Sequence, residues 1–129
     1  MKRITTLLTA TALLLTVGVP SVLAKGGDGT RVALKSAKAF PAAKGTAKFK
    51  STAEERELQV EVEHVRRLAG KRVVFVVGGK QIGTRKVNRF GAAEINRNSQ
   101  RGQFVPAVAA GTTVKVKTAA GALIVRGSF

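Results

Sequence analysis

The stretch Glu57-Leu58-Gln59-Val60-Glu61-Val62-Glu63 alternates strictly between polar and apolar side chains. Successive side chains of a β-strand point to opposite faces of the sheet, so the three apolar residues share one face and the four polar residues share the other. This alternation predicts a strand that is buried on one side.

Outward from this stretch, the chain continues as short apolar segments separated by turns. Val73 to Val77 is an unbroken β-branched and aromatic run, typical of a central strand, and Gly78-Gly79 predicts a hairpin turn into a return strand at 81–87. Further strands are predicted at 31–39, as an edge strand, and at 92–95, 114–118 and 123–129. Turns about every eight to twelve residues predict an all-β fold, a single small β-sandwich or barrel of six or seven antiparallel strands.

The core of this domain is predicted from the apolar residues that hold the alternating or continuous positions of these strands. They are Leu58, Val60, Val62, Val73, Phe75, Val77, Val114, Val116 and Ile124.

The N-terminus has the three parts of a secretory signal peptide. Lys2 and Arg3 precede an uncharged stretch at 4–19, and Val22 and Ala24 supply the small side chains that signal peptidase accommodates. We expect cleavage after Ala24, which divides the chain into a signal peptide at 1–24, a flexible glycine-rich leader at 25–30 and a β-rich domain at 31–129. The alternative is a permanent anchor, but the stretch falls short of the roughly 20 residues that span a bilayer.

No second apolar run of this kind follows, so no transmembrane segment is expected after cleavage. The chain also has no cysteine, and therefore no disulfide. Small secreted eukaryotic domains often depend on disulfides, so we expect a bacterial protein that is secreted or periplasmic.

A net charge of +16, from 23 basic and 7 acidic residues, favours polyanionic partners or an anionic surface. The clearest basic segment runs from 80 to 101, where Glu94 is the one acid and Phe90 lies among the cations, with Phe104 just beyond. Basic side chains neutralise phosphate or sulfate groups, and aromatic rings stack on bases or sugars. The predicted polyanion-binding residues are Lys80, Arg85, Lys86, Arg89, Arg97 and Arg101. The alternative is a solvated face that serves solubility.

The residues that most enzymes and metal sites need are missing or scattered. A metal site needs several Cys, His, Asp or Glu ligands, and this chain has no Cys and only one histidine, His64. No serine lies in a Gly-x-Ser-x-Gly elbow, and Gly78-Gly79-Lys80 lacks the spacing of a phosphate-binding loop. The glutamates of the acidic strand, Glu57, Glu61 and Glu63, are expected to be ionised and to form cross-strand ion pairs. We therefore expect no catalysis, metal or cofactor.

Two resemblances accompany these patterns. From Gly45 to Phe129, the Val-x-Val strand, the Ala-Gly hairpin, the Val-Pro-x-x-x-x-Gly segment and the final Gly-x-Phe resemble small secreted bacterial β-proteins of unassigned function. Residues 43–49, followed by an alternating strand, are similar to the start of domains of the chordin-repeat and copper–zinc superoxide dismutase kind. Those dismutases bind metal through several histidines, so the similarity implies architecture and no copper or zinc here.

Two functions fit these observations. The first is a non-catalytic binding module for an anionic envelope or extracellular polymer. The second is a structural or protein-interaction module whose free edge strand joins a protein partner, with the charge serving solubility. Binding through charge weakens as salt rises, whereas pairing between strands depends on backbone hydrogen bonds and resists salt.

Overall fold

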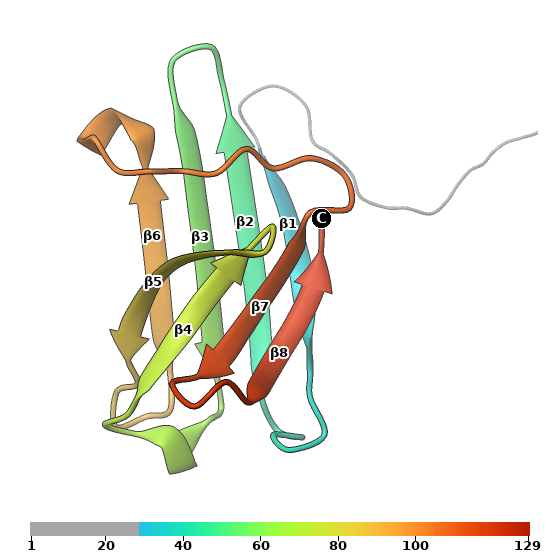
Figure 1. The fold of residues 1–129 in the computed structure, drawn as a ribbon, viewed down its shortest axis with the longest axis vertical. Coiled ribbons are helices and arrows are strands. Elements are labelled where there is room, and N and C mark those ends of the chain that lie inside the picture. The colour runs from blue at the N-terminus through green and yellow to red at the C-terminus, as the bar shows by residue number, and fades with distance from the viewer. Residues whose placement is uncertain (1–28) are drawn as a thin grey trace, which may run out of the picture.

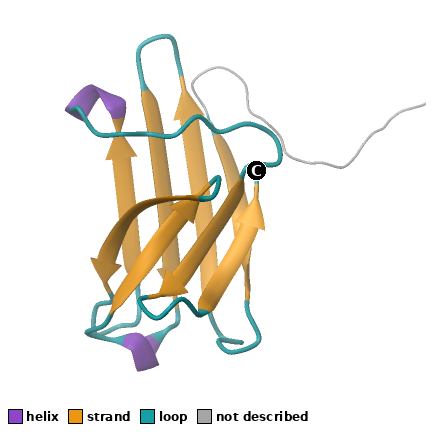
Figure 2. Ribbon diagram, viewed as in Figure 1, coloured by secondary structure: helices purple, strands orange, loops and turns teal. Residues whose placement is uncertain are grey.

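The computed structural model describes residues 29–129, which form an all-β domain of eight antiparallel strands (Figures 1 and 2). The predicted signal peptide, the cleavage site and most of the predicted leader lie outside the described residues. The strands are β1 (Thr30–Ser36), β2 (Lys44–Ser51), β3 (Arg56–Glu63), β4 (Arg72–Val77), β5 (Lys80–Lys86), β6 (Ala93–Asn98), β7 (Thr113–Thr118) and β8 (Leu123–Ser128), with short 3₁₀ helices η3 (Arg66–Leu68) and η4 (Ser99–Arg101). The first strand of the described residues begins at Thr30, the last residue of the predicted leader.

The strands are hydrogen-bonded in the order β5-β4-β7-β8-β1-β2-β3-β6, which curls into a nearly closed barrel. Figure 1 shows β1, β2, β3 and β6 as one layer, with β4, β5, β7 and β8 crossing it obliquely as the other. Strand β1 belongs to both layers, because its first part pairs with β2 while Lys35 and Ser36 pair with β8. The prediction that the first strand is an edge strand is therefore wrong.

The core lies between the two layers, and the predicted core residues are confirmed. All nine are buried, and Phe75, at 0% exposure, is the largest of the fully buried side chains. The inward positions of β3 are buried and belong to the same core cluster as those of β4 and β7, and the burial of β3 on one side is as its alternation predicts.

The expected count of six or seven strands is too low, because β2 was not predicted. Its inward-facing positions include Gly45 and Ala47, whose small side chains give no hydrophobic alternation. A larger residue would be crowded at the first of these, since a Cβ on Gly45 would lie 3.1 Å from the carbonyl oxygen of Glu61 and 3.1 Å from Cβ of Leu34. Close packing between neighbouring strands thus removes the sequence signal that would reveal β2.

Candidate polyanion-binding site

The six cations predicted from the sequence do not form one patch. Lys80, Arg85 and Lys86 lie on β5, Arg97 lies on β6, and the other two lie on either side of β6: Arg89 in the turn before it and Arg101 in η4 after it. Strand β6 alone spans about 16 Å, so Arg89 and Arg101 are at opposite ends of the barrel (Figure 1). Lys86 ends β5 near Arg89, whereas Lys80 begins it at the hairpin with β4.

Arg97 is engaged within the fold. Its register partner on β3 is the buried Leu58, and its Nη2 donates a hydrogen bond of 2.6 Å to the carbonyl oxygen of Ile82 on β5. Gly83 makes room for this contact, because a Cβ there would lie 2.7 Å from that nitrogen. Nε of Arg97 is buried without a hydrogen-bond partner among the described residues. The guanidinium therefore bridges β5 and β6, the two strands at the open seam of the barrel, and this favours a structural role.

The loop from β3 to β4 and the turn from β5 to β6 are joined by backbone hydrogen bonds. The amide of Val65 donates to the carbonyl oxygen of Gly91 (3.0 Å), and that of Gly70 donates to Val87 (2.8 Å). In return, the amide of Val87 donates to the carbonyl oxygen of Lys71 (2.8 Å). These contacts fix the loop that carries η3 against the turn that carries Arg89.

The loop from β1 to β2 contacts the loop from β3 to β4 through Arg67. The guanidinium of Arg67 donates to the carbonyl oxygen of Ala39 and lies 4.4 Å from the ring centroid of the buried Phe40, a cation–π contact. Three loops that are far apart in the sequence therefore meet at one end of the barrel. We call the exposed cations of these loops the basic end: Lys38, Arg66, Arg67, Lys71 and Arg89.

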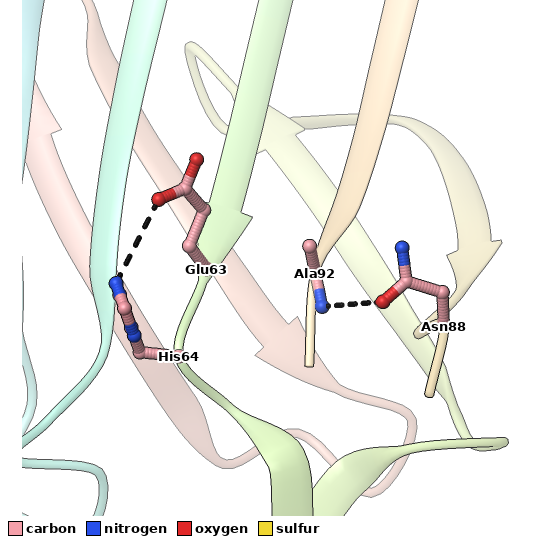
Figure 3. Close-up of polar contacts among 4 residues, drawn as sticks. All are labelled: Glu63, His64, Asn88 and Ala92. Carbon is pink, nitrogen blue, oxygen red and sulfur yellow. Dashed lines mark hydrogen bonds and ion pairs between the residues drawn. The ribbon is translucent and has the colours of Figure 1, made fainter. Parts of the chain in front are cut away.

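The turn after β5 presents a cation and an aromatic ring to solvent. Oδ1 of Asn88 accepts hydrogen bonds from the amides of Phe90 (2.9 Å) and Ala92 (3.0 Å), the second of which is drawn in Figure 3. This closes the turn and leaves Phe90 63% exposed, with the guanidinium of Arg89 at 4.9 Å from its ring centroid. A cation beside an exposed ring is the combination that the sequence predicted at this position.

The acidic residues are concentrated in the layer that contains β2, β3 and β6. All glutamates of the described residues lie on β3, on β6 or in the loop from β2 to β3: Glu54, Glu55, Glu57, Glu61, Glu63 and Glu94. At the basic end, Glu63 closes β3 and its Oε1 lies 3.8 Å from Nε2 of His64 (Figure 3). His64 is exposed, as expected for a polar-faced residue, and it has a positive φ of 64°.

The predicted cross-strand ion pairs are not formed. The register places Lys44 opposite Glu63 and Lys50 opposite Glu57, yet within residues 29–129 no lysine or arginine nitrogen lies within 4.0 Å of a carboxylate. Burial, followed by the neighbouring carboxylates of Glu63 and Glu94, raises the pKa of Glu61. Glu61 lies opposite Glu94 on β6, and its carboxyl group is therefore less firmly ionised than the sequence suggested.

The sequence missed most of the basic end. Of its members only Arg89 was predicted, although Arg66-Arg67 and Lys71-Arg72 are dibasic pairs on either side of the Ala69-Gly70 turn. That spacing is the signal that would have found them, because it places Arg66, Arg67 and Lys71 in one short connection that ends where Arg72 begins β4.

The fold and the site together define a small all-β barrel with a basic loop end. In the part of the chain that the structure describes, no three His, Cys, Asp or Glu residues are grouped so as to hold a metal ion. No helix there is long and apolar enough to cross a membrane. Comparison with protein-family models, curated proteins and solved structures finds no match.

Proposed function

We propose that the protein is a non-catalytic binding module for an anionic envelope or extracellular polymer, secreted or periplasmic, and that the basic end contacts the polymer. The observation that carries this proposal is the convergence of exposed cations from three separate loops, fixed to one another by backbone hydrogen bonds and by Arg67. Arg85 and Lys86 extend this surface along the end of β5.

The physical basis is the field of fixed like charges. Five exposed cations on three adjoining loops repel one another. Glu63, the last residue of β3, directly precedes the loop that carries Arg66, Arg67 and Lys71. A polymer with regularly spaced sulfate or phosphate groups neutralises several cations at once and releases its counterions, so its affinity falls steeply with salt. The exposed Phe90 adds a ring on which a sugar or base can stack.

The test measures the affinity of the mature protein for heparin at several salt concentrations. Reversing the charge of Arg66 and Arg89 together should weaken binding at least tenfold and flatten the slope of log affinity against log salt by roughly one unit for each true contact. The control variant reverses Lys48, on the outer face of β2, and Arg101, at the other end of the barrel, which changes the net charge equally.

Equal losses in the two variants would mean that net charge alone governs binding and that the basic end is no site. Absence of any salt-sensitive affinity for heparin, nucleic acid or anionic envelope polymer would favour the alternative, a structural or protein-interaction module. That alternative requires a free strand edge, and the first strand, to which the sequence assigned it, lies inside the sheet: its residues 30–34 pair with β2, and Lys35 and Ser36 pair with β8.

A further inference from the structure

A row of three cations crosses the outer surface where the two layers of the barrel join. Lys35 on β1 is the register partner of Arg126 on β8, and Arg126 is in turn the partner of Lys115 on β7. Side chains directly opposite each other on antiparallel strands have Cβ atoms about 5 Å apart, so the middle cation has a like charge on each side.

The same residues line a depression that also contains hydroxyl groups. Thr113 on β7 lies opposite Ser128 on β8, one step along each strand from the cation pair. With Ala33 and Gly127, which carry little or no side chain, these five polar residues surround a depression of about 480 Å³. Three cationic groups and two hydroxyl donors thus face one space that is formed by paired strands and not by loops.

The strands that line the depression, β1, β7 and β8, contain no aspartate or glutamate. Strands β4 and β5 also contain none, and the glutamates of the described residues lie elsewhere, as given above. Like charges in directly opposite positions destabilise a sheet. The arrangement is therefore unfavourable for folding by itself and becomes favourable when an anion lies among the cations.

We propose that this depression is a binding site for a tetrahedral oxyanion, a phosphate or sulfate group, held by Lys35, Lys115 and Arg126 with hydrogen bonds from Thr113 and Ser128. The site shares no residue with the basic end, although Lys35 precedes Lys38 of that surface by three residues. It lies on β1, β7 and β8, towards the C-terminus marked in Figure 1, whereas the basic end is formed by the loops at the opposite end of the barrel. Either site can fail its test without the other.

The test is a titration of the mature protein with inorganic phosphate, followed by amide chemical shifts, against sodium chloride at matched ionic strength. Saturable shifts confined to residues around 33–35, 113–115 and 126–128 are expected with phosphate and not with chloride. Arg126→Gln should lower the affinity at least tenfold, whereas Lys50→Gln, on β2 opposite Glu57 and far along the strand from Lys35, should leave it unchanged.

The hydroxyl groups distinguish a formed site from general attraction by charge. The double variant Thr113→Val and Ser128→Ala keeps every charge and should still weaken phosphate binding severalfold. An unchanged affinity, or shifts that spread over the whole surface without saturating, would overturn the proposal. Inorganic sulfate, titrated in parallel, shows which oxyanion is preferred: sulfate affinity should not vary between pH 6 and 8, whereas phosphate affinity should rise as its second proton leaves.

Stability without ligand gives an independent check. At low salt and without phosphate, Arg126→Gln should raise Tm because it removes the middle charge of the row. Lys50→Gln should lower Tm because it removes the cation opposite Glu57. A lower Tm for Arg126→Gln would show that the row is not under repulsion and would remove the basis of the proposal.

Discussion

Replacing Gly91 with alanine tests whether the loops of the basic end are held together as described. Gly91 has a φ of +84°, and a Cβ there would lie 2.6 Å from the backbone nitrogen of Arg66 and 2.9 Å from its Cα. Because the obstructing atoms belong to the backbone, the alanine methyl group fits only if the loop from β3 to β4 moves away. That movement would also strain the hydrogen bond from Val65 to Gly91.

The expected loss of stability has two parts. The left-handed backbone conformation costs an L-residue about 1–2 kcal/mol, and the steric overlap adds about 1–3 kcal/mol. Alanine also reduces the entropy of the unfolded chain, which returns about 0.4–1 kcal/mol. The net destabilisation is about 1–5 kcal/mol, which for a domain of this size lowers Tm by at least roughly 4 °C.

Gly70→Ala is the matched control. Gly70 lies in the same loop with a φ of +82°, and a Cβ there would meet no atom within 4 Å. It therefore carries the conformational strain without the overlap, and chemical denaturation followed by far-ultraviolet circular dichroism should show it to be the milder variant by about 1–3 kcal/mol. Equal destabilisation of the two variants would refute the close approach of Gly91 to Arg66, and with it the rigid basic end.

Four further predictions concern the core, the seam, the acidic strand and processing. Phe75→Ala should destabilise the domain by about 3–5 kcal/mol through a core cavity, and an unchanged melting curve would place Phe75 outside the core. Arg97→Ala should cost about 1–3 kcal/mol and speed hydrogen exchange along β5, since the bond to Ile82 is lost; an unchanged exchange rate would mean that the seam does not depend on it. Because the raised pKa of Glu61 makes its ionised form unfavourable in the folded state, Glu61→Gln should raise Tm at pH 7, and the gain should shrink as pH falls through the glutamate range; a gain independent of pH would exclude this cause. Mass spectrometry of the exported protein should find Lys25 as its first residue, whereas an intact N-terminus in membranes would contradict cleavage.

The sequence predicts those parts of the fold in which side-chain chemistry follows strand geometry. The alternation at 57–63 and the apolar run at 73–77 identify β3 and β4 because their inward positions are large and apolar. Gly78 and Gly79, both with positive φ, mark the hairpin between β4 and β5 as predicted. β2 was not predicted because its buried positions Gly45 and Ala47 hold small residues and so give no hydrophobic alternation. The position of β1 inside the sheet was not predicted, because pairing with β8 joins residues far apart in the sequence and no local pattern encodes it.

The candidate site follows the same rule. Cations that are close in the sequence form one patch only if the segment between them does not cross the molecule. Here β6 crosses the barrel between Arg89 and Arg101, so these two residues lie at opposite ends. Arg97 is a cation of the kind that binds polyanions. However, Gly83, fourteen residues earlier in the chain, has no side chain and so leaves space for the guanidinium of Arg97 in the seam. Cations from distant loops, such as Lys38 and Arg66, become neighbours only after the barrel forms.

The seam between β5 and β6 also bears on how the protein avoids self-association. An unpaired strand edge is a template for intermolecular β-pairing, and here the two edges of the sheet face each other across a gap bridged by Arg97. Each edge thereby shields the other, without a disulfide and without a covering helix. Opening the seam would expose both edges at once, so even a brief local opening would create a molecule able to add a neighbour on either side and begin a fibrous aggregate.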